Sequence, residues 1–343
     1  MIQIIENHQR VQSSLLRFWT VLIVQILIGL NSSYGAGVTI VTHGLQPGEI
    51  ADHGQGWLNA MTDFIADRAG GNAVVYDMVV DVDFLSDPLG QHPLVKSFNM
   101  VRPNPPIANV NGEIIIRLFW DGIANFESAH SLGVGTRKVA EAVAPFISNT
   151  IVSHGLSHPF AELPLHLIGH SRGASVMSEL ARKLGEDGIW VHQLTTLDPH
   201  PVSFIDESVA VRETILFADN YYEDNYRTTP NSDPVSNAFN RHLTNLDGGY
   251  GDYIPPWGDH EDVHLWYQGT VNPGYNAFDG EQTITDTLRM DWYLDGENRG
   301  AKTGFYYSRL GGGGDQQKVF AIQPNGQSLS FGYYNFGTFN SSP

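Results

Sequence analysis

The sequence predicts an α/β fold with a mostly parallel central sheet that helices cover on both faces. Short β-branched segments alternate with segments of helical spacing from residue 38 to residue 218, and strands connected through helices run parallel. Of the 343 residues, 41% are hydrophobic and 16% are charged, which is typical of a globular chain with a sizeable core. A small C-terminal β segment is expected over residues 301–343, where alternating segments follow a run of glycines.

Each expected element follows from its local pattern. Val38–Thr42 is a run of β-branched residues that ends at a His-Gly pair, so it predicts a buried strand entering a loop. Residues 81–111 are rich in proline and show no clear period, so a long surface loop is expected there. Further strands are expected over residues 73–80, 113–120, 165–168, 190–197 and 213–218. Helices are expected from residue 57 to Gly70-Gly71, from 139 to 147 and from 174 to 184.

The N-terminus predicts a secretory signal peptide over residues 1–36. Arg10 and Arg17 precede an uncharged apolar stretch, residues 18–30, and small residues suitable for cleavage follow it. That stretch is too short to span a bilayer comfortably, although an uncleaved anchor is the alternative interpretation. We therefore expect a secreted or periplasmic protein without a stable membrane span, whose main domain covers residues 37–300.

Composition excludes several classes of protein. The chain has no cysteine, so disulfides, thiolate nucleophiles and cysteine zinc sites are ruled out. A formal net charge of -18 disfavours nucleic acid and anionic membrane surfaces, because binding to phosphate needs clustered Lys and Arg. Neither a cofactor nor a metal is expected, and the oligomeric state is left open.

The pentapeptide Gly169–Gly173, with Ser171 at its centre, predicts a nucleophile elbow. An apolar strand runs into it and a helix is expected directly after it, which is the strand-turn-helix context that exposes a nucleophile. An ordinary tight turn is the alternative. The context favours Ser171 as the attacking residue of an ester-cleaving enzyme.

A serine nucleophile needs a histidine base and a carboxylate to orient it. Asp198 follows the strand over 191–197, at the strand end where α/β sheets place functional groups, and Asp219 and Asp224 are the alternative acids. Along the chain the acid precedes the histidine, and two histidines of one segment, His260 and His264, are the candidates for the base.

Two backbone N–H groups are expected to bind the developing oxyanion. The N–H of Arg172 is one, because this residue follows the nucleophile. The loop that leaves the first strand, His43-Gly44-Leu45, supplies the other, and we assign it to the N–H of Leu45.

These motifs resemble those of lipases in the α/β-hydrolase superfamily. Gly169–Gly173 resembles the elbow of both the pancreatic-type and the fungal class 3 lipases. Leu197-Asp198-Pro199 is similar to the segment with the acid in the pancreatic type, whereas His264–Tyr267 is similar to the histidine segment of the fungal group. The resemblance implies an α/β-hydrolase fold and hydrolysis of a small-molecule or lipid ester through an acyl-enzyme. It also implies His264, rather than His260, as the base.

This chain departs from both groups of lipases. The disulfides of the pancreatic type cannot form here, and the fungal type places its acid after a later strand, which keeps Asp219 and Asp224 open.

Two other functions are compatible with parts of the sequence. His260-Glu261-x-x-His264 matches the zinc-protease motif, with Glu281 as a possible third ligand, but nearby prolines and glycines leave room for only a short helix. The other is a catalytically silent binding module on a hydrolase fold, because a fold alone does not prove activity.

Overall fold

A computed structural model describes most of the chain after residue 36. The chain divides into two units, residues 1–35 and 36–343, and every described residue belongs to the second. The described residues are 37–45, 56–83, 85–87, 91–103, 110, 112–124, 134–149, 159–201, 204–223, 233–243, 246–250, 258–272, 278–280, 282–293, 303–311, 321–322 and 328–329. The predicted signal peptide and the candidate residues Asp224 and Glu281 lie outside these ranges.

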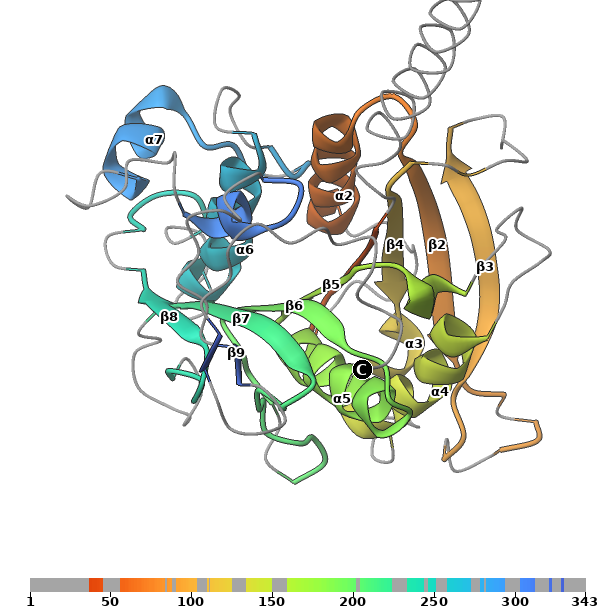
Figure 1. Ribbon diagram of the computed structural model, residues 1–343. Helices are drawn as coiled ribbons and strands as arrows, with labels where there is room; N and C mark the ends of the chain where they lie inside the picture. The colour runs from red at the N-terminus through yellow and green to blue at the C-terminus, as the bar shows by residue number, and fades with distance from the viewer. Residues whose placement is uncertain are drawn as a thin grey trace, which may run out of the picture. The chain divides into compact units, whose positions relative to one another are not determined.

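An eight-stranded sheet forms the centre of this unit (Figure 1). Its strand order is β3-β2-β4-β1-β5-β6-β7-β8, and all neighbours are parallel except β2 and β3. The strands are β1 (Val38–Thr42), β2 (Val74–Asp81), β3 (Leu94–Arg102), β4 (Ile114–Phe119), β5 (Leu165–His170), β6 (Val191–Leu197), β7 (Ile215–Tyr222) and β8 (Phe239–His242). The predicted α/β class and mostly parallel sheet are confirmed, and the architecture is consistent with a hydrolase-like fold.

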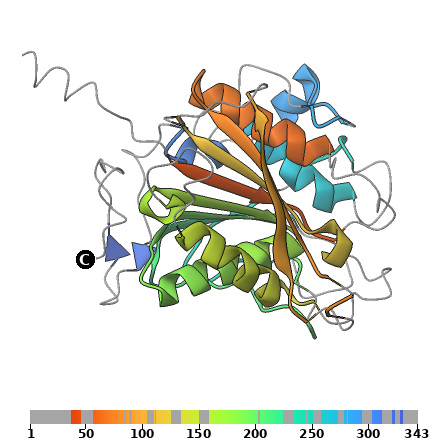
Figure 2. The same cartoon turned by 90° about the vertical axis from the view of Figure 1, so that its right-hand side faces the viewer.

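Helices cover both faces of the sheet, as Figure 2 shows from the side. One apolar cluster joins α4 and α5 to the face of β1 that carries Val38 and Ile40. The other joins α2 and α6 to the opposite face, which carries Val41. The helices are α2 (Gly56–Ala69), α3 (Asp121–Ala124), α4 (Thr136–Ser148), α5 (Arg172–Glu186), α6 (Gly258–Val271) and α7 (Asp286–Trp292), with 3₁₀ turns η3 (Phe160–Glu162) and η4 (Gly304–Tyr307).

The structure corrects two expectations about these elements. The stretch predicted as a loop over residues 81–111 contains the nine-residue strand β3. This strand lies at the edge of the sheet, where Phe98 is its one buried side chain, so it lacks the apolar signal of a central strand. Helix α6, for which only a short helix was expected, runs for 14 residues.

The C-terminal part contains a small two-stranded sheet. Strand β9 (Ala321–Ile322) pairs antiparallel with β10 (Ser328–Leu329), in line with the β character expected after residue 301. The preceding turn η4 belongs to the main core, because Phe305 is fully buried in the cluster that holds α2 and α6. Among the described helices, none combines the length and the apolar composition that crossing a bilayer requires.

Candidate active site

The order of the strands changes direction between β1 and β5, which makes this position the switch point of the sheet. Within the sheet, β2, β3 and β4 lie to one side of β1, and β5 to β8 lie to the other. In open α/β sheets, ligands bind beyond the carboxyl ends of the strands at such a point. The pairing places Thr42 beside Gly169 and His170 beside Leu197. The residues that follow β1, β5 and β6 therefore meet at one edge.

The predicted elbow is a sharp turn between β5 and α5. Ser171 has φ 57° and ψ -129°, a conformation that a residue with a side chain adopts at a cost of about 1–3 kcal/mol. Glycine is required on both sides. A Cβ on Gly169 would lie 2.3 Å from the carbonyl oxygen of Gly173, and one on Gly173 would lie 2.4 Å from that of His43. The two glycines thus let strand, turn and helix approach closely enough to hold Ser171 at the edge.

The loop leaving β1 lies directly against Ser171. A Cβ on Gly44 would stand 2.3 Å from the Cβ and 2.7 Å from the Oγ of Ser171, and 3.0 Å from the backbone nitrogen of Arg172. Leu45, half-buried, is the next residue. The two segments expected to supply the oxyanion donors are therefore neighbours.

His43 fixes the path of this loop from inside the core. Its Nδ1 donates to the carbonyl of Gly44 over 2.8 Å, and the backbone N–H of Trp120 donates to its Nε2 over 3.3 Å. Burial lowers the pKa of His43, although the Asp121 carboxylate 3.1 Å from Nε2 opposes this effect. A neutral His43 is therefore part of the support for the loop.

A buried aspartate and histidine meet just beyond β6. The Nδ1 of His260 lies 2.5 Å from the Oδ2 of Asp198, and both side chains are buried. The other oxygen of Asp198 accepts the N–H of Glu223 over 3.2 Å. Burial lowers the pKa of His260, but the hydrogen bond and charge of Asp198 raise it, and its net pKa is above the ordinary value.

The pairing of Asp198 with His260 corrects the expectation that it would meet His264. His264 lies one turn further along α6, where its Nε2 is 2.9 Å from Oε2 of Glu261. Its ring stacks on Trp57 of α2 at a centroid distance of 4.3 Å. Since α6 brings its first turn to the end of β6, a residue four positions later lies against α2 instead.

The alternative acid Asp219 lies in the sheet rather than beyond its end. It pairs in register with Thr195 of β6, whose hydroxyl donates to it over 2.6 Å, and the Tyr221 hydroxyl donates over 2.9 Å. Burial raises the pKa of Asp219 to about 6, against the effect of these hydrogen bonds. Its partners are neutral side chains, and no hydrogen bond to a histidine is found among the described residues.

The side chain of Arg172 has a structural role that the motif did not predict. Its Nε and Nη2 bind the two oxygens of Asp206 over 2.6 and 2.7 Å, and both side chains are buried. The guanidinium also lies 4.9 Å from the ring centre of Trp120. Asp206 further accepts the N–H of Thr136 at the start of α4. This ion pair anchors the residue whose backbone N–H is an expected oxyanion donor.

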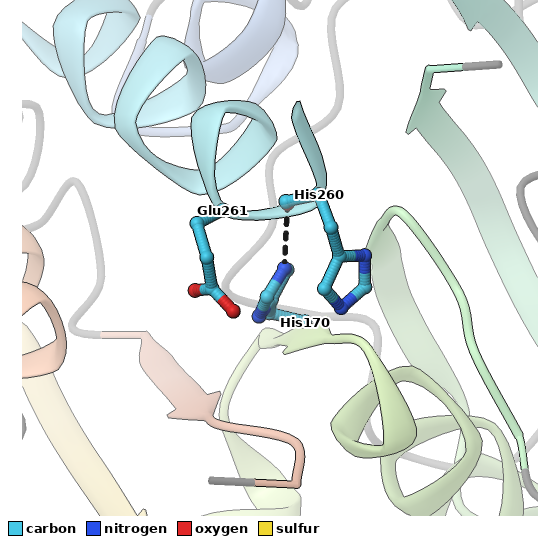
Figure 3. A group of neighbouring side chains, drawn as sticks. All are labelled: His170, His260 and Glu261. Atoms are coloured by element: carbon cyan, nitrogen blue, oxygen red, sulfur yellow. Dashed lines mark hydrogen bonds between the residues drawn. The ribbon is translucent and has the colours of Figure 1, made fainter. Parts of the chain in front are cut away.

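His170 connects the elbow to α6 (Figure 3). Its Nε2 donates to the backbone carbonyl of His260 over 3.0 Å, and the two rings are 4.5 Å apart. Burial holds the pKa of His170 well below its ordinary value. Burial also opposes ionisation of Glu261, but the hydrogen bond to His264 and the nearby histidines lower its pKa to about 2.

His170, His260 and Glu261 form a group of side chains that could hold a metal ion. One ligand atom from each lies within 4.8 Å of the others. This set differs from the zinc-protease arrangement, in which both histidines of the motif are ligands, because His264 binds Glu261 instead. Glu281, the possible third ligand of that arrangement, lies outside the described residues.

Comparisons with known proteins find little similarity to this chain. No protein-family model matches the chain. No curated protein sequence is similar to it. A crystal structure of the product of the gene lin2722 from Listeria innocua aligns with a TM-score of 0.33 and 10% identity, over 55% of this chain and 70% of that one. A likeness at this level carries no argument about function, and the α/β class is established by the observed sheet.

Proposed function

We propose that this chain is a serine hydrolase that cleaves carboxylic esters. Ser171 is the nucleophile, His260 is the base and Asp198 orients that base. The observation that carries the proposal is the buried contact of 2.5 Å between His260 and Asp198, at the edge of the sheet where Ser171 occupies its sharp turn.

Hydrogen bonds to backbone carbonyls support this grouping of three residues. The backbone N–H of Ser171 donates to the carbonyl of Leu197, the residue before Asp198, over 2.9 Å. The side chain of His170, the residue before Ser171, donates through Nε2 to the carbonyl of His260 over 3.0 Å. The turn with the nucleophile is thus bonded to the end of the strand before the acid and to the backbone of the base.

The contact with Asp198 also supports a role for His260 as a base. A carboxylate accepts the proton on Nδ1, so it selects the tautomer in which Nε2 carries the lone pair. That lone pair takes the proton of Ser171 as its Oγ attacks the ester carbonyl. His260 then donates the proton to the leaving alcohol, and water hydrolyses the acyl-enzyme by the same steps in reverse.

The N–H groups of Leu45 and Arg172 are the proposed oxyanion donors. Each such donor contributes about 2.7–4 kcal/mol to the stability of the transition state in serine hydrolases. The close approach of Gly44 to Ser171 and to the nitrogen of Arg172 supports this assignment. The proposed substrate is a small-molecule or lipid ester, on the resemblance of the sequence motifs to lipases, and the proposed location is secreted or periplasmic.

A fluorophosphonate probe tests the proposal, together with p-nitrophenyl esters of increasing acyl length. We expect the probe to label Ser171 and to abolish hydrolysis, and Ser171→Ala to lower kcat by at least about 10³-fold. Ser178→Ala is the matched control, because Ser178 is a buried serine in the helix that follows Ser171, α5, where its hydroxyl is hydrogen-bonded to the backbone of Ala210. Labelling at another residue, or full hydrolysis by Ser171→Ala, would refute the proposal.

A further inference from the structure

The group of His170, His260 and Glu261 includes two side chains, those of His170 and Glu261, that take no part in the proposed ester hydrolysis. His170 ends β5, and the other two residues lie in the first turn of α6, so two separate elements bring the three together (Figure 3). Both histidine side chains are buried, whereas that of Glu261 is 31% exposed. A ligand atom of each residue lies within 4.8 Å of the others.

Hydrogen bonds determine which nitrogen of each histidine carries the proton. Nδ1 of His260 donates to the carboxylate of Asp198, and Nε2 of His170 donates to the carbonyl of His260. In the neutral rings, the lone pair that a metal ion can bind is therefore on Nε2 of His260 and on Nδ1 of His170. Metal-binding histidines are held in this way, with the second ring nitrogen donating to a carboxylate or a backbone carbonyl.

The third side chain is held as well. Oε2 of Glu261 lies 2.9 Å from Nε2 of His264, whose ring is stacked on Trp57. Ligating carboxylates are themselves usually hydrogen-bonded. All three side chains thus have the supporting contacts that metal ligands require, and the second histidine of the His-Glu-x-x-His motif supplies one of them.

We propose that His170, His260 and Glu261 form an inhibitory site for a divalent transition metal of the zinc class. Two imidazole nitrogens with one carboxylate oxygen are a donor set that Zn²⁺ favours, whereas Ca²⁺ and Mg²⁺ favour oxygens. Tetrahedral zinc with ligands at about 2.0 Å needs ligand atoms about 3.3 Å apart, so the side chains close by at most about 1.5 Å when the ion binds. The side chain of Glu261 is partly exposed, whereas both histidine rings are buried.

Inhibition follows from the lone pair of His260. When Nε2 binds a metal ion, it cannot accept the proton of Ser171, so metal binding and ester hydrolysis exclude each other. This consequence rests on the proposed function, whereas the binding of metal does not depend on it. The two parts can therefore be tested separately.

The binding test uses the full chain with Ser171→Ala. Isothermal titration with Zn²⁺ is expected to give one ion per chain, and Co²⁺ is expected to give the strong visible absorption of a tetrahedral site. His170→Asn and Glu261→Gln, each added to Ser171→Ala, are expected to weaken binding at least tenfold. His92→Gln, which changes an exposed histidine, is the control for non-specific binding and should leave the affinity unchanged.

Thermal unfolding of each variant shows that it is folded before its affinity is compared. If Ser171→Ala takes up no zinc, or if His170→Asn and Glu261→Gln both bind as tightly as their parent, the site does not exist. Since the two variants change different elements, the misfolding of one leaves the other as a test.

The inhibition test uses ester hydrolysis by the otherwise unchanged chain. Zinc is expected to abolish hydrolysis and a chelator to restore it. Glu261→Gln is expected to raise the zinc concentration for half inhibition at least tenfold, relative to its own metal-free rate. Full activity with the site saturated would overturn the inhibition. If Ser171→Ala binds zinc but the unchanged chain hydrolyses no ester, the proposed metal site is supported and the proposed ester hydrolysis is refuted.

Discussion

Two buried aspartates on neighbouring strands have different surroundings. Asp198 lies just beyond the end of β6, where one oxygen meets His260 and the other accepts a backbone N–H. Asp219 lies within β7 and binds the neutral side chains of Thr195, Gln193 and Tyr221. Both are fully buried. Burial alone therefore does not distinguish a candidate catalytic carboxylate from a structural one; its position on the sheet and its partner do.

The largest expected effect separates the two histidines of α6. His260→Gln is expected to lower kcat by about 10⁴-fold or more, because no other group replaces the proposed base. His264→Gln is expected to lower it by less than about tenfold, since His264 binds Glu261 rather than Asp198. Both rates are measured on the same ester, with folding checked by circular dichroism. The reverse order of the two effects would restore His264 as the base.

The next largest effect is expected from the substitution of the two aspartates. Asp198→Asn is expected to lower kcat by about 10⁴-fold, because an amide stabilises the wrong tautomer of the histidine and leaves its charged form unpaired. Asp219→Asn is expected to change kcat by less than about tenfold, because its partners lie within the sheet. Steady-state rates on one ester compare the variants. Equal losses would remove the distinction between the two carboxylates.

The dependence of the free energy of unfolding on pH is expected to reveal the buried Asp219. Its pKa is about 6 in the folded chain against 3.8 for an ordinary Asp, so the folded state holds the proton more tightly. Between about pH 4 and pH 6 the unfolded chain has lost this proton and the folded chain has not. Stability therefore falls as the pH rises through this window, by about 3 kcal/mol in total.

Urea unfolding of the unchanged chain and of Asp219→Asn, at half-unit steps from pH 4 to pH 7, measures this effect. As the pH rises across the window, the free energy of unfolding of the unchanged chain is expected to fall by about 3 kcal/mol relative to that of the variant. If the two curves run parallel, Asp219 titrates as an ordinary carboxyl group.

The smallest effect is expected from one hydroxyl group in the Asp219 network. Thr195→Val removes the hydroxyl that donates to Asp219 over 2.6 Å and also lies 2.8 Å from Nε2 of His166. This change is expected to lower the free energy of unfolding by about 1–3 kcal/mol at pH 7. Thr195→Ser keeps the hydroxyl and is the matched control. Because this hydrogen bond favours the ionised carboxyl, the valine variant should also lose stability at a higher pH than the serine variant loses it. Equal stability of both variants would show that the hydroxyl contributes nothing.

Central elements were predictable from the sequence, whereas edge elements were not. β1 and β5 are fully buried, so apolar and β-branched residues dominate them and predict strands directly. β3 has a single buried side chain and flanking prolines, and it was expected to be loop. A strand at the edge of a sheet is specified by the neighbour it pairs with, in this case β2.

The sequence by itself determined the elbow, because a turn is a local property. Glycines on either side of Ser171, a strand before it and a helix after it specify the geometry that the structure contains. Asp198 was also placed by a local rule, the end of a parallel strand.

Only the tertiary structure decided which histidine meets Asp198. His260 and His264 are four residues apart and so lie on the same side of one helix, where spacing and composition cannot separate them. The choice depends on where α6 begins and which of its turns packs over the end of β6, and both depend on contacts with distant parts of the chain. The same packing brings His170 beside His260 and Glu261, and no motif in the sequence indicates that approach.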